Sequence, residues 1–400
     1  MLRLVHVSDF HLGVGFRQLV GDDVPGFVNN HILSNVKRSV DYALDNDVDI
    51  YLVTGDIFNK MLYSLNYSPY LLELFKPLVD RGIYVILIAG NHDAPKTRGK
   101  HNALYVINKL GVDRIVYIES PDESVLTVDV DGYRVGFVAL PFVNILRDAD
   151  RKISRFIRES YDKIKDSDVK ILATHLDVSG ARYSESDTLV RSFYMLPYRV
   201  NPSSLHPNLF DYVALDHIHL HQQVGGYPNM WYSGSIDRVN FGEVGQPKGF
   251  LKVDIDAGEP DVEFLETEPL NLIKVEDLEF RHKFDVKDLI SSLEGVAGLR
   301  GSLVKIEARF DRESWDDYRS LFPKVKLAVL EELGVRGFVV VPSYINLVSD
   351  AEIGPMISLD RNWIMERLRD YINSIRDIKP EDRRLMIEYS TRLIMEEYGE

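Results

Sequence analysis

The sequence contains no cysteine among its 400 residues. That absence excludes disulfide bonds, thiolate metal sites, iron–sulfur clusters and cysteine nucleophiles. Any metal ion must therefore be held by imidazole, carboxylate, amide or water ligands. A cysteine-free chain is compatible with a reducing compartment, and we expect the protein in the cytoplasm.

Positive charge and long hydrophobic runs are also scarce. The chain has 47 Lys and Arg against 62 Asp and Glu, a formal net charge of −15, which argues against a broad basic surface that coats DNA but leaves room for a local basic cleft. The longest apolar run, residues 84–89, is far shorter than the roughly 18–20 residues that span a bilayer. Polar residues 8 and 9 also follow too early for a signal peptide. We therefore expect no membrane partner.

Short aliphatic runs in the first 270 residues predict strands that are buried on both faces. Amphipathic stretches between them predict helices, and Asp131–Gly132 predicts a hairpin turn between 125–130 and 133–140. This alternation indicates a layered α/β fold. The expected strands are 2–7, 49–53, 83–88, 169–173 and 212–215, and the expected helices are 30–45, 65–79, 103–110 and 145–164.

The polar clusters stop after about residue 270, and a second pattern begins. A strand–helix–strand–helix–strand series over 272–280, 286–293, 303–310, 315–333 and 338–343 predicts a small second α/β domain, and two more helices are expected in the tail. The length also suits two or three domains. The expected divisions are 1–268, 269–350 and 351–400.

Asp, Asn and His residues follow five of the predicted strands, where ligands collect in open α/β sheets. Asp9 and His11, like His217 and His219, lie two residues apart, so on extended chain both members point to one side. Seven or more such ligands exceed the need of one tetrahedral ion, which favours two cations bridged by Asp56. Mn, Fe, Zn and Co all remain open. The clustered residues are Asp9, His11, Asp56, Asn91, His92, Asp93, His175, His217 and His219.

A lone histidine is more often structural than a ligand, and we expect His6, His31, His206 and His282 to be structural. The nine clustered residues differ because ionisable groups at one end of a core sheet are costly unless they bind something. We therefore interpret them together as a metal centre.

The order D-x-H, G-D, G-N-H-[DE], a single H and H-x-H resembles the calcineurin-like metallophosphoesterase superfamily. More narrowly, the chain is similar to the double-strand-break repair nucleases of the SbcD and meiotic-recombination-eleven type. The resemblance implies a β-sandwich flanked by helices, a smaller capping domain and a C-terminal helix pair. The stretches that carry the narrower resemblance are 8–13, 55–58, 210–215, 232–238, 241–243 and 248–250.

The resemblance also implies roles for single residues. His92 would stabilise the transition state and protonate the leaving group, with Asp93 orienting its ring. Mn²⁺ is the usual activator of the family. One cation would be held by Asp9, His11, Asp56 and His219, and the other by Asp56, Asn91, His175 and His217.

Two positions depart from the pattern of the repair nucleases. Asn59 stands where the family carries a histidine that helps arrange DNA at the metals, so we expect weakened exonuclease action. Asp216 replaces the glycine before His217, where its charge would either oppose a phosphate or orient a ligand histidine.

The resemblance implies three partners, which we expect here: DNA, a second copy of the chain and an SMC-like coiled-coil ATPase of the SbcC type. Basic residues Lys96, Arg98 and Lys100 follow the G-N-H-D motif and suit phosphate contacts, as Asn59 does through hydrogen bonds. Helix 65–79 has apolar surface to spare for a dimer, and the C-terminal helices suit docking of the ATPase.

The leading hypothesis is thus a two-metal DNA phosphodiesterase in break repair. Two alternatives remain: another phosphoesterase of the superfamily that acts on nucleotides or phosphoproteins, and a catalytically weakened scaffold that binds DNA ends.

Overall fold

The protein is described from a computed structural model, in which contacts group residues 1–344 into one compact unit and 345–400 into another. The predicted C-terminal helices over 351–400 lie almost entirely outside the described residues. The boundary expected at 268/269 stays a prediction. The structure describes residues 1–95, 99–143, 148–183, 199–256 and 259–345, together with Ile372, Arg383 and Ile387.

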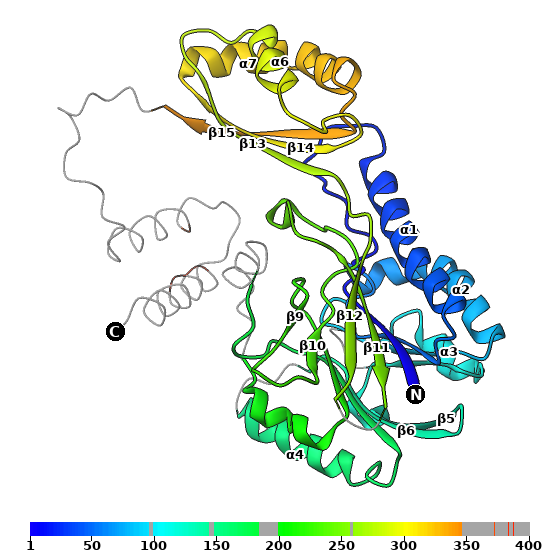
Figure 1. Ribbon diagram of the computed structural model, residues 1–400. Helices are drawn as coiled ribbons and strands as arrows, with labels where there is room; N and C mark the ends of the chain where they lie inside the picture. The colour runs from blue at the N-terminus through cyan, green and yellow to red at the C-terminus, as the bar shows by residue number, and fades with distance from the viewer. Residues whose placement is uncertain are drawn as a thin grey trace. The chain divides into compact units, whose positions relative to one another are not determined.

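Two six-stranded sheets form the first 266 residues, one ordered β12-β11-β1-β2-β3-β4 and the other β5-β6-β7-β8-β10-β9 (Figure 1). Both are mixed: β1 to β4 pair in parallel, as do β6, β7, β8 and β10, whereas β11 pairs antiparallel with β1 and β12. The predicted layered α/β fold and the predicted β5–β6 hairpin are confirmed. The bounds are β1 Leu2–Val7, β2 Ile50–Val53, β3 Tyr84–Ile88, β4 Ile115–Ile118, β5 Val125–Val130, β6 Tyr133–Leu140, β7 Val169–His175, β8 Tyr212–Asp216, β9 Gln222–Gln223, β10 Met230–Tyr232, β11 Gly249–Ile255 and β12 Asp261–Glu266.

Both sheets are covered on both faces, which explains why their central strands are continuously hydrophobic. On β1, Leu2 and Leu4 belong to the core between the sheets, whereas Val5 and Val7 belong to the core beneath the helices of the first sheet. A third core packs the outer face of the second sheet against α4. The covering helices are α1 Val24–Asp45, α2 Ser64–Asp80, α3 Tyr105–Leu110 and α4 Ala149–Tyr161.

The two sheets are joined where β1 ends. Ser8 forms an isolated parallel bridge with Ser235, and the Ile236 amide donates to the Ser8 carbonyl at 3.3 Å. This link brings the loop after β1 next to the loop after β10. The carboxyl ends of parallel strands from both sheets therefore meet at one place, where the predicted site residues lie.

A third, wholly parallel sheet follows, made of β13 (Leu272–Phe280), β14 (Leu303–Phe310) and β15 (Gly337–Tyr344). Helices α6 (Val286–Glu294) and α7 (Arg312–Leu327) cover one of its faces (Figure 1). The helix expected over 315–333 is shorter than predicted, because its last turn, Ala328–Glu332, is π-helical. None of the described helices is long and apolar enough to cross a membrane.

Candidate metal centre

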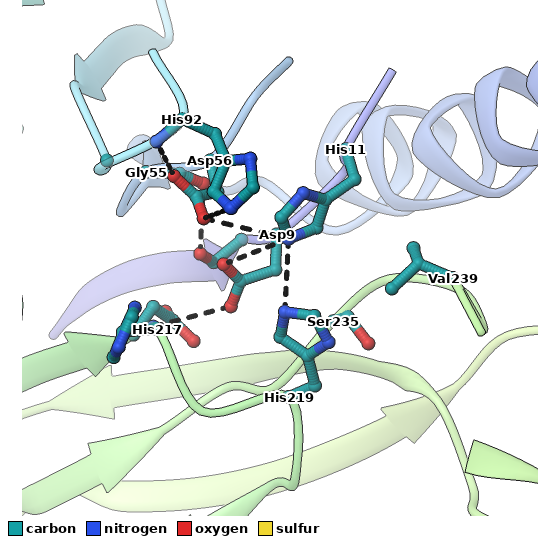
Figure 2. A network of polar contacts seen from close by, with 12 residues as sticks. Asp9, His11, Gly55, Asp56, His92, His217, His219, Ser235 and Val239 are labelled. Carbon is teal, nitrogen blue, oxygen red and sulfur yellow. Dashed lines mark hydrogen bonds and ion pairs between the residues drawn. The ribbon is translucent and has the colours of Figure 1, made fainter. Parts of the chain in front are cut away.

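The predicted ligands come from loops that follow strands of both sheets. The loops after β1 and β2 carry Asp9, His11 and Asp56, while His217 and His219 follow β8 in the second sheet. Figure 2 shows the side chains of Asp9, His11, Asp56 and His219 turned toward one another, with the main-chain amide of His217 beside Asp9. Asn91 and His92 follow β3, and His175 is the last residue of β7.

The backbone at four of these residues adopts positive φ, a region that non-glycine residues rarely occupy. The φ angles are 50° at Asp9, 48° at His11, 47° at Asp56 and 112° at His217. The expectation that extended chain aims the paired ligands to one side is therefore corrected: left-handed turns aim them. Such strain persists where surrounding contacts fix it, and here the His11 amide donates to the Asp56 carbonyl at 2.9 Å.

Asp56 lies at the centre of the group. Its Oδ2 is 3.6 Å from His11 Nε2, 3.5 Å from His175 Nε2 and 4.0 Å from His92 Nε2. Its Oδ1 accepts a hydrogen bond from the His92 amide at 2.9 Å, which fixes the carboxylate plane. Gly90 is required beside it, since a Cβ there would lie 2.1 Å from Oδ1 of Asp56. One oxygen is thus anchored, while the other faces three imidazoles.

Three overlapping groups of side chains could each hold a metal ion, with ligand atoms within 4.8 Å of one another. In one group, Nε2 of His11 and Nε2 of His219 are 3.0 Å apart. The predicted amide ligand joins another, because Oδ1 of Asn91 lies 3.1 Å from His175 Nε2 and 3.0 Å from His217 Nδ1. The groups are Asp9–His11–His219, His11–Asp56–His92 and Asp56–His175–His217.

The site fits a divalent cation on the evidence of Asp9. This side chain is fully buried, and its Oδ1 has no hydrogen-bond partner within the described parts of the chain. Burial raises the pKa of Asp9 to about 8, with Asp216 and Asp56 adding to the rise and His219 opposing it. A buried carboxylate oxygen without a hydrogen-bond partner costs free energy, and a bound cation would remove that cost.

Two neighbouring histidines have pKa values shifted in opposite directions. Burial acts to lower the pKa of His175, but the charges of Asp56 and Asp9 outweigh it and raise the pKa to about 10. Burial and the adjacent His175 lower the pKa of His217 to about 3. For Asp56, burial is outweighed by His175 and His92, which hold its pKa well below the usual range. Large opposed shifts in one cluster are typical of functional sites.

His92 lies at the rim, with 36% of its side chain exposed. Its Nδ1 lies 2.8 Å from the main-chain carbonyl of Asn59. The expectation that Asp93 orients this ring is corrected, because the Asp93 carboxylate instead accepts the amides of Ile57, Phe58 and Gly90 at 2.9–3.0 Å. Asp93 therefore joins the loops that carry Asp56 and His92, and the Asn59 carbonyl is the group next to the ring.

Of the four residues predicted to contact DNA, the structure describes two. Lys100 is exposed and Asn59 is half-buried. Lys96 and Arg98 lie outside the described residues.

Asp216, the position that departs from the family pattern, has its side-chain hydrogen bonds with His6, Thr54, Ser233 and the Gly234 amide, and none with a candidate ligand ring among the described residues. Its buried carboxylate lies 2.8 Å from Nε2 of His6, and accepts from the hydroxyls of Thr54 and Ser233. The Thr54 carbonyl in turn lies 2.9 Å from Nδ1 of His175. His6 is thus structural as expected, in a network beneath the ligands that the sequence did not predict.

A second buried carboxylate was also missed. Glu243 contacts the His219 ring, yet it lies 24 residues further along the chain, outside every polar cluster. Stretches 241–243 and 248–250 of the sequence could have pointed to Glu243. Both are similar to the repair nucleases, and neither has a role among the predicted ligands.

A family model described as calcineurin-like phosphoesterase matches residues 2–219, which is more than half of the chain. The chain belongs to this family. Within the calcineurin-like phosphoesterases, it is 24% identical over 279 residues to the DNA double-strand break repair protein Mre11 of Methanopyrus kandleri, and 26% identical over 274 residues to the SbcD component of the nuclease SbcCD of Staphylococcus epidermidis. The matches cover 67% and 64% of this chain, and 57% and 66% of those relatives.

Two solved structures of phosphatases are also similar. A dimetal phosphatase from Danio rerio aligns over 66% of this chain and 98% of its own, with a TM-score of 0.37 and 9% identity. A purple acid phosphatase from yellow lupin aligns over 63% of this chain and 49% of its own, with a TM-score of 0.39 and 14% identity. The family match and the observed sheets confirm the resemblance to the calcineurin-like family and the fold class that it implied.

Proposed function

We propose that this protein is a metal-dependent DNA phosphodiesterase that acts in double-strand-break repair. The observation that carries the proposal is the convergence of six other candidate ligands, which offer imidazole, carboxylate and amide groups, around Asp56. The similarity to Mre11 and to SbcD supports DNA as the substrate. The expected metal is Mn²⁺, because sulfur-free ligands suit it and the resembling nucleases use it.

The groups of candidate ligands support our inference of two cation positions. When bound, two divalent cations supply charge stabilisation of a phosphate and activation of water as a nucleophile. Asp56, between the groups, would contribute to both positions. One position would be held by Asp9, His11, Asp56 and His219, and the other by Asp56, Asn91, His175 and His217.

His92 would be the proton donor to the leaving oxygen. With Nδ1 anchored at the carbonyl of Asn59, its imidazolium form presents Nε2–H toward the candidate ligands, 4.0 Å from Oδ2 of Asp56. The side chain of Asn59 is not the group that anchors the ring, so an Asn59→His substitution leaves that contact available. It would add a second titratable ring where the repair nucleases have one, and we propose that its absence weakens digestion from DNA ends.

The proposal includes two protein partners in the cytoplasm. On α2, Leu71 and Phe75 are buried, whereas Leu65 and Tyr70 are 68% and 57% exposed, as is Leu62 at 68% in the turn before the helix. This apolar face suits pairing with a second copy of the chain. The other partner is an SMC-like ATPase of the SbcC type, docked through residues 351–400.

The test is a Mn²⁺-dependent cleavage assay with single-stranded circles and blunt duplexes in parallel. We expect cleavage of circles, weak degradation of duplexes, loss of both activities in His92→Ala and Asp56→Ala, and increased duplex degradation in Asn59→His. Hydrolysis of bis-p-nitrophenyl phosphate or cyclic nucleotides without any DNA cleavage would favour another phosphoesterase. Binding of DNA ends without hydrolysis would favour the scaffold.

A further inference from the structure

Glu243 and Lys248 form a buried ion pair behind the metal centre. Glu243 ends a short 3₁₀ turn (Phe241–Glu243) after β10, and Lys248 immediately precedes β11. Both side chains are at most 1% exposed, and the carboxylate lies 3.1 Å from the ammonium. Because a buried ion pair is seldom a net source of stability, its presence here calls for another explanation.

The pair holds a predicted ligand, His219, from two sides. Oε1 of Glu243 lies 2.7 Å from Nδ1 of His219, and Nζ of Lys248 donates to the main-chain carbonyl of the same histidine at 3.1 Å. The carboxylate is itself fixed by the Val239 amide at 3.0 Å and the Asn240 side chain at 3.1 Å. Ring and backbone of His219 are therefore both constrained.

The contact with Glu243 determines which nitrogen of His219 can bind a cation. A carboxylate only accepts hydrogen bonds, so Nδ1 carries the proton and Nε2 keeps its lone pair. That Nε2 points at Nε2 of His11, 3.0 Å away, beside Asp9 (Figure 2). Carboxylate–histidine pairs of this kind orient metal ligands and raise their basicity.

The other histidines of the centre are oriented differently. Nδ1 of His175 lies 2.9 Å from the Thr54 carbonyl, and Nδ1 of His217 lies 3.0 Å from Oδ1 of Asn91. Different groups therefore hold these two rings, whereas Glu243 holds the ring of His219. Through His219, Glu243 acts on the Asp9–His11–His219 group.

We propose that Glu243, supported by Lys248, is a positioning residue that sets the cation affinity of one of the two metal positions. The proposal deepens the proposed function, because it rests on the site binding two cations, but it does not depend on DNA being the substrate. The proposal predicts that removal of the Glu243 carboxylate lowers the cation affinity of one metal position more than that of the other.

The experiment is a calorimetric titration of the metal-free full chain with Mn²⁺, without DNA. The wild type should take up two ions. Glu243→Ala should weaken one of them by about 10–100-fold and leave the other unchanged. Glu243→Gln, which keeps an oxygen acceptor for Nδ1–H, should weaken the same ion by less.

Asp237→Asn provides the matched control. Asp237 is a buried carboxylate in the same segment. It also contacts a histidine, with Oδ2 2.8 Å from Nδ1 of His31, but His31 is not one of the predicted ligands. It should leave both affinities unchanged, and an equal loss in this control would overturn the proposal. Unchanged binding in Glu243→Ala, equal weakening of both ions, or no Mn²⁺ uptake by the wild type would overturn it too.

If the Glu243 variants fail to fold, the proposal can be tested on the wild-type protein through the protonation of the His219 ring. A ¹⁵N-histidine spectrum of the metal-free protein, with His219 assigned by its loss in His219→Gln, should show the proton on Nδ1. A proton on Nε2 overturns the proposal. Failure of DNA cleavage with two-site binding intact would count against the proposed function only.

Discussion

Two regions of the molecule carry different kinds of side chain at the carboxyl ends of their parallel strands. In the two-sheet part, they carry Asp56, His175 and their neighbours, among them Asp9, whose buried Oδ1 has no hydrogen-bond partner among the described residues. In the three-stranded sheet, the last residues of β13, β14 and β15 are aromatic and stand side by side in register. They are Phe280, Phe310 and Tyr344.

The aromatic ends stabilise their region, whereas the charged ends cost stability in theirs. The Phe310 ring is 1% exposed, and its centroid lies 5.3–5.4 Å from those of Phe280, Trp315 and Tyr318, distances typical of favourable aromatic pairs. Carboxylates of this region instead begin helices: Asp285 and Asp311 accept amide hydrogen bonds at the starts of α6 and α7. The same place in a sheet therefore serves packing in one region and ligand binding in the other.

The largest expected effect is at Asp56. Asp56→Asn removes the charge that both metal positions share, so phosphodiester hydrolysis with Mn²⁺ should fall by about 10⁴-fold, close to 5.5 kcal/mol in activation free energy. The rate on bis-p-nitrophenyl phosphate measures this, with far-UV circular dichroism as the control for folding. A variant that kept a tenth of the wild-type rate would remove Asp56 from the centre of the mechanism.

The counterpart in the aromatic region is Phe310→Ala. Loss of this buried ring should reduce the free energy of unfolding by about 3–5 kcal/mol, because it leaves a cavity among four other rings. Hydrogen exchange in β13–β15 measures the loss locally. Hydrolysis per folded molecule should stay unchanged, and a matching fall in activity would break the distinction between the two regions.

Adding Mn²⁺ should separate the regions without any mutation. At a hundred times the dissociation constant, one bound ion adds about 2.7 kcal/mol to the free energy of unfolding of the part that binds it. Exchange protection should therefore rise around β1, β2, β7 and β8, and stay the same in β13–β15. A chelator should reverse the effect, and equal protection of both regions would show that they unfold as one.

The smallest effect is expected at a helix start. Asp285 accepts the Lys287 amide at 3.0 Å, and Asp285→Ala should cost about 1 kcal/mol of stability with no change in Mn²⁺ affinity. Urea denaturation and the metal titration together check this. A change in Mn²⁺ affinity would show that this helix is energetically coupled to the candidate metal centre.

The sequence predicted the strands, and the clustering of the candidate ligands, because both depend on local patterns. Continuous aliphatic runs identify strands covered on both faces, and the polar residues after them, such as Asp56 and His175, can only meet at the shared edge. In the sequence of residues 351–400, clusters of Asp, Asn and His after aliphatic runs are not found.

What the sequence could not predict depends on contacts between distant segments. Asp216 meets His6 across 210 residues, and Glu243 meets His219 from a turn without any strand signal. The ring of His92 contacts a main-chain carbonyl, which every residue at position 59 would offer. Local side-chain type therefore identified the candidate ligands, but not the groups that contact them.

The pairing of β1 with β11 has a consequence for biosynthesis. Leu2 pairs with Ile255, so β1 lacks one of its two neighbours until β11 has been translated. His217 and His219 are translated long after Asp9, His11 and Asp56, so the candidate ligands come together only late in synthesis. Until then the hydrophobic strand β1 has one unpaired edge, which is the kind of surface that a chaperone protects.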